Sequence, residues 1–494
     1  MRILLLSMPD AFEHMPTVAI RMPNGALTSL AGNLDPHHDV AVADLVLVQD
    51  RVKATVRDLL RAREPELVGL SVMTFQRPTA LKIAALVRAE RPSARIVVGG
   101  YDPSLAPDVY TDSSTNIDFI VRGEGELTFR ELTRALEQRS RLDSIAGLSW
   151  RRDYRTEVVH NPPRHAGPVD TIALPNRRAR VLTGYTMLGR RVDVVETSRG
   201  CTFDCSFCSI VEMRGRNFHP FSIDRVLADI ADARAQGART VFLVDDNIML
   251  DVRRFSDLCR AIVDAGLHEL RYIVQAMTSS LANHGDELAP LMRRANFRYV
   301  FLGIENIVEE DLEFLRARAK NRERRSGANA SVRATDLVRK HGMYVVGGLI
   351  VGNPGDTRAS IEANLAFARR HVDWPYIQHP TPYPGTPMSR DLRQRGLVLH
   401  DRVEEYDGTT AVVGNDALSG EEIEFQRWRA ERWMKVRHIP KAFRENPAFV
   451  LRHARQMLAH TFRGNTTRTW LGLEDSRQAF RRYRAIRERE REYL

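Results

Sequence analysis

The sequence predicts an α/β protein in three parts: a doubly wound parallel sheet, a partial (β/α)6 barrel and a helical carboxyl-terminal domain. Short apolar runs alternate with helical stretches in the first 140 residues, and the same alternation returns further along the chain. With 494 residues, 43% of them hydrophobic, the chain is long enough for about three cores. The expected domains are 1–140, a connector over 141–190, the barrel over 191–395 and the helical domain over 396–494.

The first domain should contain five parallel strands with turn residues after them. The expected strands are Ile3–Leu6, Val40–Ala43, Leu67–Val72, Arg95–Val98 and Phe119–Val121. The turns are Ser71–Pro78, Gly99–Pro103 and Gly123–Glu126. In open α/β sheets, ligands bind at the carboxyl ends of the strands. Glycines there let the backbone approach a bulky ligand, and helix N-termini offer N–H groups to its anionic parts.

A hairpin is expected in the connector, from Ile145–Trp150 and Glu157–Val159, and six strands are expected in the barrel. The barrel strands are Val192–Glu196, Thr240–Val244, Tyr272–Gln275, Tyr299–Gly303, Met343–Ile350 and Tyr376–His379. The carboxyl ends of these strands should hold the functional site.

Beyond about residue 400, aromatic residues on charged helices are expected to form a core. They are Phe425, Trp428, Trp433, Phe443, Phe449, Met457 and Phe462. The net charge is +10, but the arginine-rich run from Arg481 is interleaved with glutamates, which favours a solvated helix over a nucleic-acid surface. We therefore expect no nucleic-acid partner.

Three of the four cysteines, Cys201, Cys205 and Cys208, fall within eight residues directly after the first barrel strand. Such clustering indicates thiolates converging on one metal centre in a reducing cytoplasm. Three thiolates leave one iron of a four-iron cluster without a protein ligand, whereas a structural zinc site takes four ligands. Only one Cys-x-x-Cys pair exists here, which disfavours zinc. The fourth cysteine, Cys259, is interpreted as a packing residue.

The pattern Cys-x-x-x-Cys-x-x-Cys at the first strand end of a partial barrel resembles the radical S-adenosylmethionine (SAM) enzymes. The resemblance implies that the three cysteines hold a [4Fe-4S] cluster, that SAM chelates the fourth iron, and that one electron cleaves SAM to a 5′-deoxyadenosyl radical. It implies an electron donor such as flavodoxin or ferredoxin. The positions matching SAM-binding elements are Phe207, Asp245, Asp246, Asn247, Glu305, Gly348, Ile350 and Gly352.

The amino-terminal domain resembles the flavodoxin-like cobalamin-binding domain that precedes the barrel in a large radical SAM subclass. The implied cobalamin-binding residues are Ser71, Thr74, Gly99, Gly100, Asp102, Gly123, Glu124, Gly125 and Glu126. The sequence has no Asp-x-His-x-x-Gly motif, although His14, His37 and His38 occur in this domain, so cobalt should bind without a histidine ligand. Asp102 stands where many relatives carry histidine, which puts its contact with the lower face in question.

Both cofactors together imply methyl transfer to an unactivated carbon. The runs 99–107 and 194–201 look similar to methylases of hopanoid lipids, which suggests a polycyclic lipid substrate and a role in lipid biosynthesis. Substrate choice is expected in the carboxyl-terminal helices, whose arginines and aromatics could rest on the inner membrane surface of the cell. The loop 379–387 is either a substrate wall or a stiff connector. No catalytic base can be named.

Two alternatives remain open at this point. Some relatives use the same pair of domains to oxidise or close rings without methyl transfer. The other alternative is a cobalamin- or iron-sulfur-based sensor that binds nucleic acid, although no helix-turn-helix or other reading module is present in the sequence.

Overall fold

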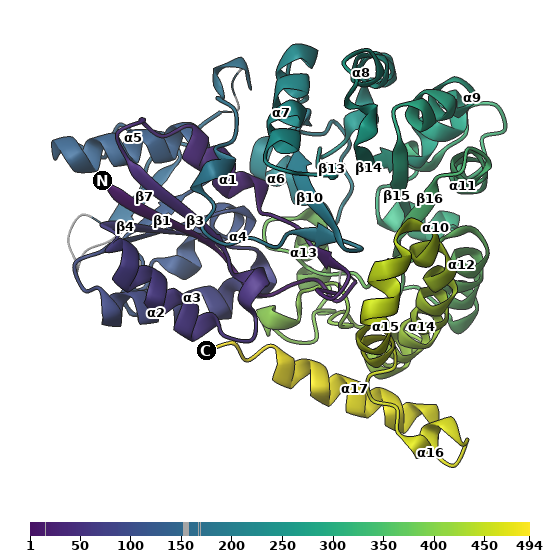
Figure 1. Cartoon of the computed structure of the whole chain (residues 1–494). Coiled ribbons are helices and arrows are strands. Elements are labelled where there is room, and N and C mark those ends of the chain that lie inside the picture. The colour runs from purple at the N-terminus through teal and green to yellow at the C-terminus, as the bar shows by residue number, and fades with distance from the viewer. Residues whose placement is uncertain (15, 152–157, 166, 168) are drawn as a thin grey trace.

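Two largely parallel sheets organise the computed structural model (Figure 1). The structure describes residues 1–14, 16–151, 158–165, 167 and 169–494. The expected α/β class, with a doubly wound domain, a partial barrel and a helical carboxyl-terminal region, is confirmed.

The N-terminal sheet has the strand order of a flavodoxin-like domain. Its parallel strands are β1 (Arg2–Ser7), β3 (Asp39–Asp44), β4 (Leu67–Ser71), β5 (Arg95–Gly99) and β6 (Phe119–Val121). They lie in the order β3-β1-β4-β5-β6, so the direction of winding switches between β1 and β4. The antiparallel hairpin of β7 (Leu148–Arg151) and β8 (Val158–His160) extends this sheet beyond β6. Glu157, the first residue expected in the second hairpin strand, lies outside the described residues.

Alternation along the strands divides the core of this domain into two layers. In β1, Leu4 and Leu6 face one cluster of apolar side chains, and Ile3 and Leu5 face the other. Helices α2 (Val52–Arg63) and α3 (Arg77–Glu90) cover the first face, while α1 (Gly25–Gly32) and α5 (Gly125–Gln138) cover the second. In α2, the buried residues Val52, Val56 and Leu60 recur every four positions and so share one side of the helix.

Six parallel strands in chain order form the barrel sheet. They are β10 (Arg190–Val195), β13 (Thr240–Leu243), β14 (Arg271–Met277), β15 (Phe297–Glu305), β16 (Tyr344–Ile350) and β17 (Trp374–Gln378). The two short strands β9 (Thr186–Met187) and β2 (Ile20–Arg21) continue the sheet beyond β10, and β11 (Ser198–Arg199) pairs with β12 (His219–Pro220). None of these four short strands was expected, because two residues carry no readable periodicity.

Helices pack along the outside of the barrel sheet. They are α7 (Ile223–Ala235), α8 (Val252–Asp264), α9 (Thr278–Arg294), α11 (Ser331–Lys340) and α12 (Arg358–His371). The helices α6 (Ile210–Arg214), α10 (Glu309–Phe314) and α13 (Pro387–Gln394) lie around the loop of the clustered cysteines instead. Cys259 lies on α8 with 1% of its surface exposed, within the largest apolar core, as expected of a packing residue.

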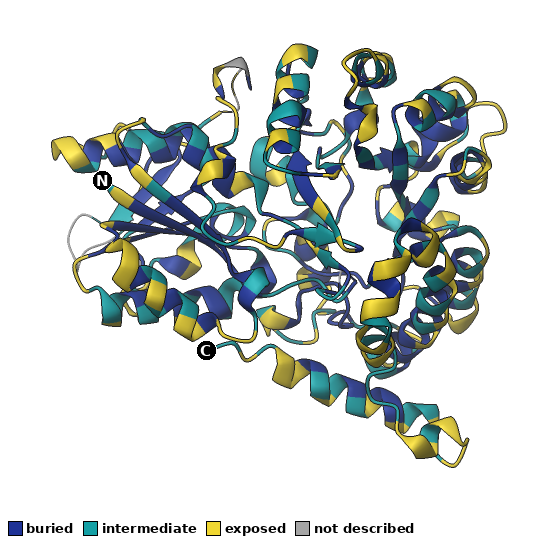
Figure 2. Cartoon of the chain, viewed as in Figure 1, coloured by how far each residue is buried: buried dark blue, intermediate teal, exposed yellow. Residues whose placement is uncertain are grey.

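The carboxyl-terminal region consists of α14 (Gly420–Glu445), α15 (Pro447–Thr461), α16 (Thr467–Trp470) and α17 (Ser476–Glu490). Of these helices, α14 and α15 pack beside the barrel, whereas α16 and α17 lie below them in the view of Figure 1. Phe425 and Trp428 are buried against α17, in agreement with the expected aromatic core. Trp433 and Phe443 were expected to be buried but are 55% and 43% exposed. They lie on α14, whose outer surface remains uncovered in the described structure, and Figure 2 shows the exposed faces of these helices.

The chain returns to the N-terminal domain after α17. Figure 1 shows α17 running from the helical region toward that domain, and Tyr493 and Leu494 pack on the apolar cluster between α2, α3 and the sheet. The expectation of a solvated helix over the run from Arg481 holds for only one side of α17. On α17, Arg487 is 4% exposed and donates hydrogen bonds to the hydroxyls of Thr409 and Thr410, because this side of the helix faces the protein.

Candidate cofactor sites at the facing strand ends

The cysteine loop follows β10 at the carboxyl end of the barrel strands. Cys201, Cys205 and Cys208 all line one cavity of about 140 Å³. The barrel fixes this loop through Ser206, whose N–H donates to the carbonyl of Leu315 at 3.0 Å and whose hydroxyl donates to the carbonyl of Phe314 at 3.0 Å. The sequence thus brings three thiols to one wall of a small cavity.

Gly200 enables the close turn that enters this loop. Its φ angle of +89° lies in the left-handed region, and an added Cβ would come within 2.2 Å of Oδ1 of Asn217. Both the backbone conformation and the space therefore require glycine directly before Cys201.

The donor set of this cavity fits an iron-sulfur cluster better than a structural zinc ion. Burial raises the pKa of Cys208 to about 12 and also raises that of Cys205, so a metal must displace protons to bind these thiols. Among the described residues lining the cavity there is no fourth cysteine and no histidine. Three thiols without a fourth thiol or an imidazole match a cluster with one iron left for another molecule.

Four predicted SAM-binding residues lie in the same cavity. Phe207 belongs to the cysteine loop, Asp246 and Asn247 follow β13, and Glu305 ends β15. Nδ2 of Asn247 lies 3.7 Å from Sγ of Cys201. The structure thus brings aromatic, amide and carboxylate groups beside the thiols.

Glu305 occupies an unusual backbone position. Its φ angle is +59°, which is uncommon for a residue other than glycine, and the register between β15 and β16 shifts at this point. Its carboxylate forms an ion pair with the ammonium group of Lys320, which also lines the cavity. Strained residues of this kind are enriched at functional sites, although the same conformation also occurs at helix ends such as Glu64.

The other predicted SAM-binding residues do not line this cavity. Asp245 is buried and accepts hydrogen bonds from Thr197 and Ser198, and burial raises its pKa to about 7. Gly348 lies against the ring of Phe301, which is itself part of the cavity wall. The remaining two, Ile350 and Gly352, lie in apolar packing, the latter beside Ile423.

A larger cavity of about 380 Å³ lies between the N-terminal sheet and the barrel. Seven of the nine predicted cobalamin-binding residues line it: Ser71, Gly99, Gly100, Gly123, Glu124, Gly125 and Glu126. Gly100 has a φ angle of +110°, and an added Cβ would lie 2.7 Å from the carbonyl oxygen of Val72. The glycines form a cradle in which backbone, rather than side chains, faces the cavity, and this arrangement suits a bulky ligand.

Thr74 and Asp102 are not among the lining residues of the large cavity. Asp102 is fully buried, accepts hydrogen bonds from Nε and Nη2 of Arg77 at 2.8 and 2.7 Å, and accepts another from the hydroxyl of Tyr110 at 2.6 Å. A carboxylate with this many partners holds the loop after β5 together.

The glutamates of the Gly-Glu-Gly-Glu turn pair with two arginines of the barrel. Arg199 donates to Glu126 at 2.7 Å and to Glu196 at 2.8 Å, and it contacts Glu124 at 3.4 Å. Arg214 donates to Glu124 at 2.9 Å. We call these five residues the arginine clasp. The sequence did not reveal it, because no periodicity connects Arg199 with glutamates more than seventy positions earlier.

Arg214 of the clasp lies between the two cavities. Arg214 lines the large cavity, Asp246 lines the small one, and their charged groups lie 3.6 Å apart. Tyr101, at the start of α4 (Tyr101–Leu105), also lines the large cavity, and burial beside Asp246 raises the pKa of its phenol. The two cavities therefore share a wall made of a few side chains.

Two known domain families match separate parts of the chain. The radical SAM superfamily matches residues 195–368, and the B12 binding domain matches residues 15–133. The chain therefore contains a radical SAM domain and a B12-binding domain. These two domains imply a [4Fe-4S] cluster, SAM and cobalamin as cofactors.

Similar proteins include methyltransferases and a cyclase. An uncharacterized methyltransferase of Pyrococcus horikoshii is 27% identical over 92% of this chain and 97% of its own length. The hopanoid C-3 methylase of Methylococcus capsulatus is 27% identical over 74% of this chain and 68% of its own. The anaerobic magnesium-protoporphyrin IX monomethyl ester cyclase of Synechocystis is 27% identical over 65% of this chain and 64% of its own.

A solved structure shares the fold of this chain. The radical SAM methyltransferase TsrM of Kitasatospora setae, with cobalamin and a [4Fe-4S] cluster bound, matches it with a TM-score of 0.64 and 22% identity. The match covers 80% of this chain and 75% of TsrM. It agrees with the order of the domains and with the partial barrel described above.

Proposed function

We propose that this enzyme transfers a methyl group to an unactivated carbon of a small apolar substrate, with a polycyclic lipid of the hopanoid type as the leading candidate. The observation that carries the proposal is the shared wall between the thiol-lined cavity and the glycine-lined cavity. A substrate at this wall would reach both sites. The bound cluster and SAM supply hydrogen abstraction, and bound cobalamin supplies methyl transfer.

In the small cavity, we assign the cluster to Cys201, Cys205 and Cys208. Phe207 is placed to pack on the adenine, while Asp246 and Asn247 offer acceptors to the amino group of SAM. The carboxylate of Glu305, oriented by Lys320, would accept from the ribose hydroxyls. This division of roles follows from side-chain chemistry and from the shared position of these residues in the cavity.

In the large cavity, the glycines after β5 and β6 are assigned to the cobalamin. No described residue lining it is a histidine, which supports binding without a histidine ligand to cobalt. Of the three histidines in this part of the chain, His14 lies beside Glu431, and His37 and His38 lie beside Glu137. Glu124 and Glu126 serve cobalamin indirectly, because the clasp holds their turn against the barrel.

The lipid substrate is supported by the likeness to a hopanoid methylase and by the surface of the carboxyl-terminal helices. Trp433, Leu451, Trp470 and Leu471 are exposed there, and α15 carries arginine and histidine but no acidic residue. No described helix is long and apolar enough to cross a bilayer. We propose that these helices rest on an anionic membrane surface from the cytoplasmic side, where the three thiols stay reduced. The test is co-flotation of the protein with anionic liposomes. A protein that does not float with the liposomes would contradict this contact.

Ring formation without methyl transfer is the second candidate function. It is favoured by one observation, the likeness to a magnesium-protoporphyrin ester cyclase over 65% of this chain. The same pair of cavities could serve it, since hydrogen abstraction opens both reactions.

Anaerobic turnover with methyl-deuterated SAM, a reductant such as reduced flavodoxin, cobalamin and a hopanoid extract separates the two candidates. A product carrying three deuteriums is expected by mass spectrometry. An oxidised or cyclised product without label would contradict methyl transfer and support the cyclase. In a parallel reaction, Cys205→Ala should abolish formation of 5′-deoxyadenosine, and unchanged cleavage of SAM would overturn the cluster assignment.

A further inference from the structure

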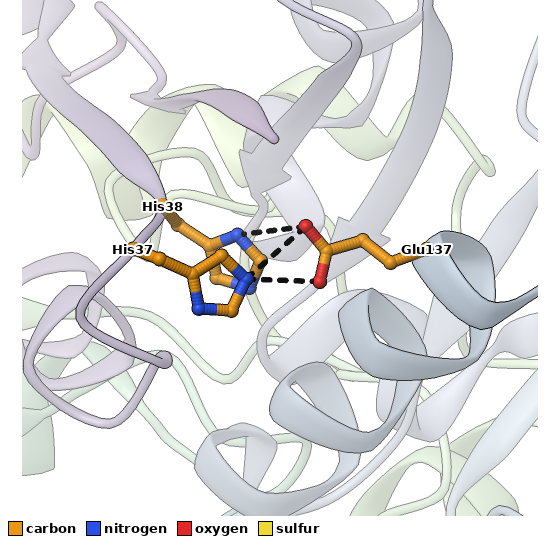
Figure 3. Close-up of side chains that lie close together, drawn as sticks. All are labelled: His37, His38 and Glu137. Atoms are coloured by element: carbon orange, nitrogen blue, oxygen red, sulfur yellow. Dashed lines mark hydrogen bonds and ion pairs between the residues drawn. The ribbon is translucent and has the colours of Figure 1, made fainter.

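Two adjacent histidines and a glutamate meet at the end of the N-terminal domain away from both cavities (Figure 3). His37 and His38 directly precede β3, the edge strand of the sheet, and Glu137 lies in the last turn of α5. The cavities lie at the carboxyl ends of these strands, so this cluster is separate from the cofactor sites.

The spacing of the three side chains fits a transition-metal ion. Nε2 of His37 lies 3.0 Å from Oε2 of Glu137, and Nδ1 of His38 lies 3.4 Å from Oε1. One ligand atom from each residue lies within 4.8 Å of the others. In a tetrahedral site with bonds of about 2.0–2.1 Å, ligand atoms are separated by about 3.3 Å. Small shifts of the exposed His37 ring would therefore complete such a geometry.

The protonation states also suit a metal. Nδ1 of His38 lies 3.1 Å from the α-amino nitrogen of Met1, so its lone pair faces the cluster. The His38 side chain is fully buried, and its Nε2 has no hydrogen-bond partner among the described residues. Burial lowers the pKa of His38 and favours the neutral ring, while the hydrogen bond from His37 lowers the pKa of Glu137. Neutral imidazole and ionised carboxylate are the ligating forms.

We propose that His37, His38 and Glu137 bind one divalent transition-metal ion, with zinc the best match to two imidazoles and a carboxylate. A fourth ligand would come from solvent, since the ring of His37 is exposed. The metal would join β3 to α5 across a hundred residues of chain. It would thereby clamp the edge of the sheet against its covering helix.

The competing explanation is a plain ion pair of Glu137 with Met1 and His37, without affinity for metal. The test uses the full chain with its iron-sulfur cluster assembled, so that the three clustered thiols are occupied. Zinc binding is measured by calorimetry, and zinc content by metal analysis after gel filtration. Wild-type protein should retain one equivalent and unfold at a higher temperature with zinc than without it.

The His37→Ala variant is the decisive comparison, because this ring is 60% exposed and its loss leaves packing intact. We expect at least a tenfold weaker affinity for zinc in His37→Ala and in Glu137→Gln. His268→Ala, at an exposed histidine beside the barrel, should bind zinc like the wild type. Equal affinity of His37→Ala and wild type would overturn the proposal, as would a failure of the wild type to bind zinc at micromolar concentrations. Zinc absorption-edge spectra should show nitrogen and oxygen ligands, and sulfur ligands would also contradict this site.

Discussion

Replacing Glu126 by Gln tests the arginine clasp. Glu126 and Arg199 are 6% and 4% exposed, so their ion pair is shielded from solvent. Burial alone would raise the pKa of Glu126, but the charge and hydrogen bond of Arg199, with a hydrogen bond from Ser29, lower it from 4.5 to about 2. A tenfold change in ionisation corresponds to about 1.4 kcal/mol, so the ionised form is favoured by about 3 kcal/mol in the folded protein.

Glu126→Gln should therefore lower the free energy of unfolding by about 2–3 kcal/mol at pH 7. The measurement is urea unfolding of the apoprotein, followed by circular dichroism. Because the folded pKa lies below the unfolded one, this stabilisation is complete above pH 4.5 and is lost as the pH falls toward 2. The difference between wild type and variant should shrink over that same range.

Glu131→Gln provides the matched control. Glu131 lies on the same helix α5, but its side chain is 40% exposed in its ion pair with Arg164. Solvent screens such a pair, so the control should lose less than about 1 kcal/mol. If Glu126→Gln costs no more than Glu131→Gln, or if its effect does not depend on acid pH, the clasp does not stabilise the contact between the domains.

Three further predictions concern the cavities. Cys205→Ser should fail to retain four irons after anaerobic reconstitution, measured by iron and sulfide analysis, and full retention would contradict its role as a ligand. Lys320→Met leaves the carboxylate of Glu305 without its ion-pair partner in a buried site. The variant should bind SAM about tenfold more weakly, measured by equilibrium dialysis. An unchanged affinity would show that Lys320 does not orient Glu305. Gly100→Ala forces a Cβ to 2.7 Å from the carbonyl oxygen of Val72. The variant should lose about 1–3 kcal/mol of unfolding free energy, measured by thermal unfolding. An unchanged melting temperature would show that the position is not strained.

The sequence was sufficient to predict the strands and the cysteine loop. Runs such as Leu67–Val72 are apolar along their length because a parallel sheet is covered on both faces, and all eleven parallel strands expected are present. The loop was predictable because three cysteines in eight residues have few explanations other than a metal.

Side-chain direction at the strand ends was harder to predict. Asp245 and Asp246 are neighbours after β13, yet Asp245 turns into the protein and Asp246 lines the cavity. Adjacent residues in extended chain point to opposite sides, and the sequence does not say which side holds the ligand. The direction of the Asp102 side chain was also not predictable, because its partner Arg77 lies on a different helix and the pairing forms only in the folded chain.

Trp433 and Phe443 show a second limit. Their spacing on α14 resembles that of core residues, but burial depends on whether another element covers that side of the helix. Coverage is a property of the tertiary arrangement. An exposed aromatic on a charged helix is therefore recognisable only after its neighbours are placed.

The return of the chain from α17 to the first domain bears on how this enzyme could be re-engineered. Tyr493 and Leu494 pack on the N-terminal core, and Arg491 donates to the carbonyl of Glu404 on the way. A chimera that exchanges only the helices beyond residue 400, in order to change substrate choice, would carry a foreign docking segment onto that core. A successful exchange would therefore also have to replace the surface residues of α2 and α3 that contact this segment. A bulky tag attached at Leu494 would press against the same surface.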